Sequence, residues 1–122
     1  MTLQERENIV RPFIGKTVRV EIDRPMGYVH HKGAKTLVYP VNYGYIPGVR
    51  GGDGEELDVY VLGIDHPVTE CTVRVVGIVW RADDVEDKLI AAPAGVTVSA
   101  ADAAAELDFA EQYYHSRVEI FV

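Results

Sequence analysis

The chain has 122 residues, a length typical of one folded domain spanning residues 1–122. Hydrophobic residues make up 48% of it and charged residues 25%, which excludes a disordered chain. Twelve lysines and arginines against nineteen aspartates and glutamates give a net charge of −7. That charge disfavours nucleic acid as a partner, and it repels a polyanionic substrate unless metal cations mediate the contact.

The cysteine content and the N-terminal segment indicate where the protein works. Cys71 is the single cysteine, so neither an intrachain disulfide nor a zinc site built from cysteines can form. Apolar runs extend for only a few residues, far short of a bilayer span. Residues 1–13 carry two glutamates and lack the apolar core of a signal peptide. We therefore expect a cytoplasmic protein without a membrane partner.

Alternation of apolar and polar residues predicts a mainly β chain. Along Leu57–Leu62, Asp58 and Tyr60 lie on one face, opposite Leu57, Val59 and Val61. The predicted strands, in chain order, are Thr17–Ile22, Thr36–Tyr39, Leu57–Leu62, Thr72–Trp80, Lys88–Ala92 and Arg117–Val122.

One helix is predicted near the end of the chain, over about Ala100–His115. Ser99 followed by Asp102 resembles a capping box, and Ala103, Leu107, Ala110 and Tyr114 then recur at helical spacing. A closed barrel hides the strand edges of so short a chain. The expected fold is therefore α+β and mainly β, a small closed β-barrel with a C-terminal helix.

Two dense acidic clusters carry the strongest chemical signal. Eight acids fall in the segments DGEELD and DDVED, namely Asp53, Glu55, Glu56, Asp58, Asp83, Asp84, Glu86 and Asp87. Such density is unfavourable unless the charges are solvated or neutralised by cations. The clusters are therefore either solvated loop charges or oxygen ligands, which suit Mg²⁺, Mn²⁺ or Ca²⁺.

A tyrosine-rich segment, Tyr39–Gly48, reads YPVNYGYIPG and precedes the first acidic cluster. Three tyrosines, two prolines and two glycines in ten residues are typical of a rigid turn with aromatic packing. The same segment could also present phenolic hydroxyls as hydrogen-bond donors to anionic oxygens. Both interpretations stay open on the sequence.

The order of these segments closely resembles the soluble family I inorganic pyrophosphatases. The family signature (Asp, small residue, Asp, Pro or Glu, aliphatic, Asp, aliphatic) corresponds to residues 53–59, with Glu55 at an aspartate position. The tyrosine motif matches over Tyr39–Ile46, VEDKLIAAP resembles the later acidic-lysine motif, and Phe109, Glu111 and Tyr113 resemble the late helix. The resemblance implies an OB-like barrel that hydrolyses inorganic pyrophosphate through a metal-activated water, with Mg²⁺ as cofactor or Mn²⁺ as a substitute.

Roles follow from the same resemblance, residue by residue. Metal ligands would be Asp53, Asp58 and Glu86, with Glu55 activating the water. Lys88 and Asp58 would share in catalysis, and the phosphate groups would be held by Arg19, Tyr43, Lys88 and Tyr113. The resemblance also implies a homo-oligomer.

Several positions depart from the family pattern. Arg81 stands where the family has a metal-binding aspartate, so it would contact phosphate directly, while Asp83 or Asp84 would supply the missing carboxylate. His31 and Lys32 both lie near the place of an early phosphate-binding arginine. Two alternatives therefore stay open: a hydrolase of another phosphoanhydride on the same fold, and a barrel that binds anions without catalysis.

Overall fold

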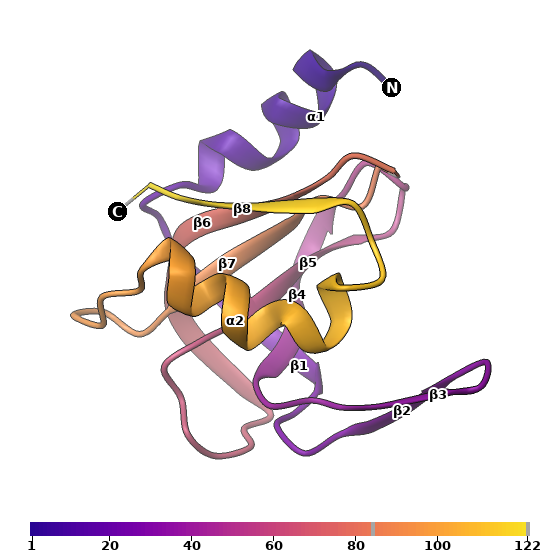
Figure 1. Ribbon diagram of the computed structural model, residues 1–122. Coiled ribbons are helices and arrows are strands. Elements are labelled where there is room, and N and C mark those ends of the chain that lie inside the picture. Colours follow the sequence, from indigo (N-terminus) through magenta and orange to yellow (C-terminus); the bar gives the residue numbers. More distant parts are fainter. Residues whose placement is uncertain (84, 122) are drawn as a thin grey trace.

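The computed structural model describes residues 1–83 and 85–121 (Figure 1). Its helices and strands follow one another along the chain as α1 (Leu3–Val10), a 3₁₀ turn (Arg11–Phe13), β1 (Thr17–Arg24), β2 (Val29–Lys32), β3 (Lys35–Val38), β4 (Asn42–Arg50), β5 (Glu56–Val61), β6 (Glu70–Arg81), β7 (Lys88–Ala92), α2 (Ala100–Glu111) and β8 (Ser116–Ile120).

Five strands close into a barrel, as the alternation pattern predicted. The order is β1-β4-β5-β7-β6, and pairing of β1 with β6 joins the two ends. Within this sheet only β5 and β7 run parallel, and β8 adds to the outer part of β6. Strand β6 has twelve residues and pairs with β1 over residues 70–74, with β7 over residues 74–79 and with β8 over residues 77–81. The prediction of a mainly β closed barrel with a C-terminal helix is confirmed.

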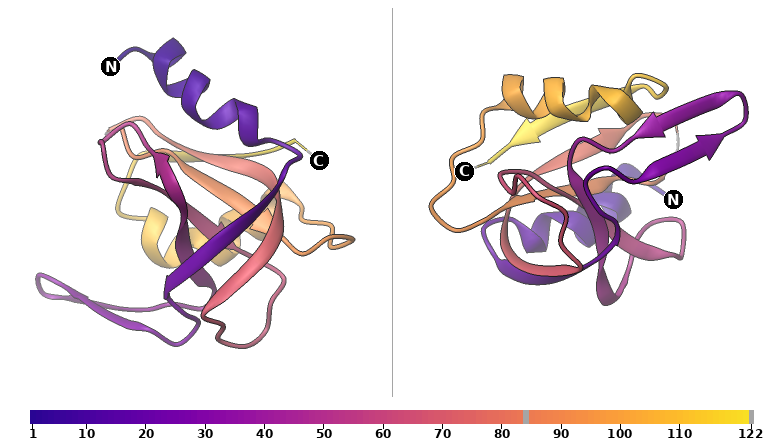
Figure 2. Two further views of the ribbon diagram at one scale, coloured as in Figure 1. Left: turned by 180° about the vertical axis from the view of Figure 1, so that it is seen from behind. Right: turned by 90° about the horizontal axis from the view of Figure 1, so that it is seen from below.

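The barrel carries one apolar layer inside and another on its outer wall. All five barrel strands contribute to the inner cluster, which includes Val20, Val59 and Leu89, and Val10 of α1 joins it. Figures 1 and 2 show α1 lying across one end of the barrel and α2 against the wall. The outer cluster lies under α2 and includes Tyr60 and Leu107. Tyr60 thus lies opposite Val59, as the alternation predicted, and β5 presents its polar face to the outside of the barrel.

The tyrosine-rich segment forms a strand rather than the predicted turn. Residues 42–50 make up β4, which pairs with both β1 and β5. Gly44 makes this pairing possible, since a Cβ atom there would lie 1.8 Å from the backbone oxygen of Glu21. Gly44 is therefore required where two strands approach each other closely, whereas Gly48 of the same segment has open space around its Cβ position and a positive φ of 79°.

Other differences from the predicted elements lie at the edges of the barrel. Helix α1, with a capping box between Thr2 and Glu5, and strand β2 were not predicted. Strands β2 and β3 form a separate hairpin that projects from the barrel (Figure 2). Helix α2 begins after its Ser99 cap as predicted but ends at Glu111, and the following turn carries Tyr113 and Tyr114. The last residue of the predicted strand Arg117–Val122 lies outside the described residues.

Candidate functional site

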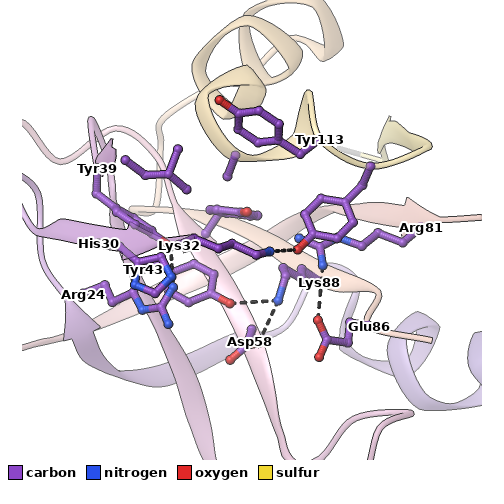
Figure 3. A pocket seen from close by; sticks show the side chains of 14 residues that line it. Arg24, His30, Lys32, Tyr39, Tyr43, Asp58, Arg81, Glu86, Lys88 and Tyr113 are labelled. Carbon is purple, nitrogen blue, oxygen red and sulfur yellow. Dashed lines mark hydrogen bonds and ion pairs between the residues drawn. The ribbon is translucent and has the colours of Figure 1, made fainter. Parts of the chain in front are cut away.

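A pocket of about 230 Å³ lies between the outer wall of the barrel, the β2–β3 hairpin and the C-terminal end of α2 (Figure 3). Its ionisable lining combines four lysine or arginine side chains, one histidine, two carboxylates and five tyrosines. They are Arg24, Lys32, Arg81 and Lys88; His30; Asp58 and Glu86; and Tyr39, Tyr43, Tyr60, Tyr113 and Tyr114. The pocket is therefore locally cationic, although the whole chain has a net charge of −7.

Lys88 lies at the centre of one polar cluster in this pocket. Its buried Nζ donates to Asp58 Oδ2 and to the Tyr43 hydroxyl oxygen, both at 2.8 Å (Figure 3). Val59 pairs with Leu89 in the parallel β5–β7 ladder, which brings the preceding residues, Asp58 and Lys88, side by side. Burial, together with the negative charge of Asp58, raises the pKa of Tyr43 well above its ordinary value. Tyr43 therefore keeps its proton and can donate a hydrogen bond to an anion.

A second cluster fixes Arg81 at the end of β6. Its Nε donates to Glu111 Oε1 at 3.0 Å and its Nη2 to Glu111 Oε2 at 2.7 Å, both in the interior. The Tyr60 hydroxyl donates to Glu111 Oε2 at 2.6 Å, and the Tyr114 ring lies 3.7 Å from the guanidinium carbon. Burial alone would raise the pKa of Glu111, but the hydrogen bonds from Arg81 and Tyr60 outweigh it and the pKa is lowered. Arg81 is thus held by a carboxylate that stays ionised.

Glu86 bridges this second cluster to solvent. It lies in the loop between β6 and β7, and its Oε2 is 3.2 Å from Arg81 Nη1 (Figure 3). The Glu86 side chain is 42% exposed, whereas the Arg81 side chain is 4% exposed. Among the residues that the structure describes, Arg81 therefore contacts one buried and one half-exposed carboxylate.

The remaining basic side chains come from β1 and the hairpin. Arg24 Nη1 donates to the Tyr39 hydroxyl oxygen at 2.6 Å, and Lys32 contacts the Tyr114 hydroxyl. Lys32 lines the pocket, while His31, its alternative in the sequence, is exposed and contacts Thr36 across the hairpin. Of the two residues, the fold therefore brings Lys32 to the pocket.

Sequence reasoning did not single out Arg24 or the clamp formed by Glu111. The register of β1 shifts between Ile22 and Arg24, so alternation cannot show to which side Arg24 points. The Glu111 contact depends on how α2 docks on the barrel, which the helical pattern does not specify. The Arg24–Tyr39 pair carries no local motif that could have indicated it.

Other predicted site residues lie outside the pocket lining. Asp53, Glu55 and Asp83 are exposed, and Asp53 Oδ1 accepts a hydrogen bond from the backbone N–H of Glu55 at 3.0 Å. Arg19 is exposed on β1, where it pairs with Glu21 and, at 2.6 Å, with Glu70. Asp84, the alternative to Asp83, lies outside the described residues. The roles expected for these residues stay predictions.

Two residues of the second acidic cluster, Glu86 and Asp87, have different surroundings. Glu86 faces the pocket, whereas Asp87 is buried and accepts hydrogen bonds from the Arg81 backbone N–H at 2.9 Å and from Arg6 Nε at 2.7 Å. Asp87 therefore anchors α1 and the end of β6 rather than facing the pocket.

Among the described residues, the pocket offers a divalent cation two carboxylates, Asp58 and Glu86. Across residues 1–83 and 85–121, no three histidine, cysteine, aspartate or glutamate side chains gather closely enough to hold a metal ion. Asp58 and Glu86 are each paired with a basic side chain. Mg²⁺ commonly takes one or two carboxylates and completes its shell with water and substrate phosphates. The carboxylates of the described residues thus fit one Mg²⁺ held largely by substrate, and as arranged they do not form a cluster for several ions.

No helix in the described part of the chain combines the length and the apolar character needed to cross a bilayer.

Sequence comparison relates this chain to inorganic pyrophosphatases. The family model described as inorganic pyrophosphatase matches residues 10–121. The inorganic pyrophosphatase of Rickettsia conorii is 33% identical over 104 residues, covering 80% of this chain and 60% of the relative. That of Rickettsia prowazekii is 32% identical with the same coverage. The chain therefore spans about 60% of the length of these curated relatives.

Structural comparison also finds inorganic pyrophosphatases, from other organisms. The crystal structure of inorganic pyrophosphatase from Ehrlichia chaffeensis matches with a TM-score of 0.66 and 19% sequence identity, covering 88% of this chain and 87% of that chain. At this identity the likeness concerns the fold. It confirms the OB-like barrel that the resemblance implied.

Proposed function

This chain belongs to the inorganic pyrophosphatase family, and on that premise we propose that residues 1–122, as one domain, hydrolyse inorganic pyrophosphate to two phosphates. The observation that carries the proposal is the buried Lys88 that joins Asp58 and Tyr43 in a pocket rich in basic side chains. Pyrophosphate is a small polyanion, and a desolvated pocket with fixed cations and hydroxyl donors stabilises charge on its oxygens.

The pocket offers each part of the substrate a partner. Lys88 of β7, Arg24 of β1 and Lys32 of β2 all line the cavity and would contact phosphoryl oxygens. Tyr43 and Tyr113 add hydroxyl donors. The Asp58 side chain is 32% exposed, which supports the proposal that it would orient an attacking water and accept its proton. With these roles, the reacting bond would lie near Lys88.

Pyrophosphatases of this family generally depend on Mg²⁺, and we propose the same dependence here, with Mn²⁺ as a substitute. Asp58 and Glu86 would hold the ion together with oxygens of the incoming pyrophosphate. When bound, Mg²⁺ would draw charge from the phosphoryl oxygens and lower the pKa of the attacking water. Ligand roles for Asp53 and Asp83, and water activation by Glu55, would require these exposed side chains to turn toward the pocket.

A phosphate-release assay with pyrophosphate, ATP and polyphosphate, each with and without Mg²⁺, tests the proposal. We expect release from pyrophosphate with Mg²⁺, and a loss of at least about 100-fold in Lys88→Met and Asp58→Asn, because each removes a charged group from the reacting centre. Glu106→Gln, an exposed position on α2, is the control and should release phosphate at the wild-type rate. Full activity in Asp58→Asn would contradict the site, and preference for ATP or polyphosphate would point to another phosphoanhydride.

A second candidate function is anion binding without catalysis. Both carboxylates of the pocket are engaged by basic side chains, an arrangement that favours holding an anion over collecting metal ions. Binding of pyrophosphate without any release of phosphate, in the presence of Mg²⁺ or Mn²⁺, would support this candidate and overturn the hydrolase.

One groove on the surface of the protein is relevant to how the chain assembles. A groove of about 580 Å³, lined in part by Leu3 and Trp80, lies near the exposed side chain of Phe121. The groove also contains the charged side chains Arg6, Glu7 and Arg117, and surfaces that mix apolar and charged side chains in this way occur between subunits. We propose a cytoplasmic homo-oligomer, and light scattering coupled to gel filtration measures its mass in solution.

A further inference from the structure

Among the described residues, two carboxylates of very different character contact Arg81. Glu111 binds it through two hydrogen bonds of 3.0 and 2.7 Å, is 6% exposed, and is held in turn by Tyr60. Glu86 lies farther away, at 3.2 Å from Nη1, and its side chain is 42% exposed. One carboxylate is therefore part of the interior, and the other is a half-solvated neighbour on the pocket side.

The geometry also shows which of the two contacts can be exchanged. Releasing Glu111 would leave an ionised carboxylate buried without its partner, which is strongly unfavourable. Releasing Glu86 returns its charge to water, in which its side chain is already partly immersed, so the cost is small. An anion that enters the pocket would therefore replace Glu86 on Arg81 and leave the Glu111 clamp intact.

We propose that Glu86 is an internal counter-anion of Arg81, and that one phosphoryl group of pyrophosphate displaces it on binding. The inference rests on the proposed function for the identity of the ligand. A phosphoryl group offers the guanidinium the same kind of oxygen acceptors as a carboxylate, with more negative charge. Arg81, oriented by Glu111, thereby becomes a substrate-binding residue, and the second phosphoryl group falls to Lys88.

The counter-anion role of Glu86 also predicts how anion binding depends on divalent cations. Arg24, Lys32, Arg81 and Lys88 supply positive charge within the pocket, and the described residues hold no group of three metal-ligating side chains. The first binding step should therefore proceed without a divalent cation, and removing Glu86 should favour it. A residue whose only role was to bind metal would have no such effect.

Isothermal titration calorimetry with methylenediphosphonate, a diphosphate analogue that cannot be hydrolysed, tests this in metal-free buffer. Wild-type protein should bind the analogue, Arg81→Gln should weaken binding by about tenfold or more, and Glu86→Gln should tighten it by about threefold or more. Arg74→Gln, also on β6, and Glu106→Gln are exposed controls and should bind like the wild type. Arg81→Lys retains the charge but loses the planar fork, so it should bind between wild type and Arg81→Gln.

The sign of the Glu86→Gln effect decides the inference, whether or not Arg81→Gln folds. Unchanged or weaker binding by Glu86→Gln, or binding by the wild type only when Mg²⁺ is present, would overturn it. Tighter binding by Glu86→Gln in a protein that releases no phosphate would support the counter-anion and overturn the proposed hydrolysis. Phosphate release by the wild type together with weaker binding by Glu86→Gln would support the proposed hydrolysis and overturn the counter-anion role of Glu86.

Discussion

Glu111 is the buried residue on which the position of Arg81 depends. It receives hydrogen bonds from both Arg81 and Tyr60, and its side chain is 6% exposed. A guanidinium held by two parallel hydrogen bonds keeps a fixed plane, which a single contact would not enforce. In this arrangement the side chains of Arg81 and Glu111 must both stay ionised in the interior of the protein.

The buried pair predicts a pH-dependent contribution to stability. The folded pKa of Glu111 is lowered, so its stabilising effect is fully present above the ordinary glutamate pKa of about 4.3 and is lost as the pH falls through the folded pKa. Glu111→Gln should lower the free energy of unfolding by about 3 kcal/mol at pH 7, because it breaks a buried ion pair. The difference in the free energy of unfolding between the wild type and Glu111→Gln should become smaller below about pH 4.3.

Urea unfolding of both proteins between pH 3 and pH 7 measures the difference. Glu106→Gln, on the exposed face of the same helix, serves as the matched control and should show no such pH-dependent difference. A gap between wild type and Glu111→Gln that stays constant over this pH range would contradict an ionised Glu111.

The family resemblance singled out Tyr43, Asp58 and Lys88, which lie in three separate motifs of the sequence. The β4–β5 and β5–β7 pairings bring these three residues to one pocket, while the roles expected for them stay predictions. Arg24 could not be placed, because the shift in β1 breaks its alternation. The Glu111 clamp depends on contacts between α2 and the end of β6, far apart in the sequence, which no local pattern encodes.

At the scale of elements, β4 shows how composition can conceal a strand. Proline and glycine in YPVNYGYIPG indicated a turn, since both are depleted in strands. The structure uses the glycine for close approach, because Gly44 pairs with Ile22 and a side chain there would meet the β1 backbone. The strands with regular alternation were predicted, whereas β4 required knowledge of its neighbours.

Gly44→Ala tests this close approach. A Cβ atom at 1.8 Å from the Glu21 backbone oxygen cannot be accommodated by moving a flexible side chain, so β1 and β4 must separate. We expect a loss of about 3 kcal/mol or more in the free energy of unfolding, measured by urea denaturation.

Gly51→Ala provides the comparison for that substitution. A Cβ atom at Gly51 would have its nearest neighbour at 3.5 Å, an ordinary contact, and its backbone lies outside the left-handed region. Its stability should change by no more than about 1 kcal/mol. Equal stability changes in the two variants would show that β1 and β4 are not as closely paired as described.

At the scale of the whole molecule, the closure of the β-barrel and the distribution of charged side chains have different physical causes. The closed barrel was predictable because a short β-rich chain must hide its strand edges, and pairing of β1 with β6 achieves this. The charge distribution was not predictable, because it depends on which loops face outward. Asp53, Glu55 and Asp83 are exposed, while Arg24, Arg81 and Lys88 line one pocket. An acidic protein thus contains a cationic cavity.

This separation predicts how ionic strength affects anion binding. At 0.1 M salt, charges more than about 10 Å apart are largely screened, so the pocket cations act on a bound diphosphate more strongly than distant surface acids do. The affinity for methylenediphosphonate in metal-free buffer should therefore fall, by about threefold or more, when sodium chloride rises from about 50 to 200 mM. Calorimetry at several salt concentrations measures it. The dependence should be shallower in Arg81→Gln, which has one pocket cation fewer, and an affinity that rises with salt would mean that the net charge of −7 controls binding instead.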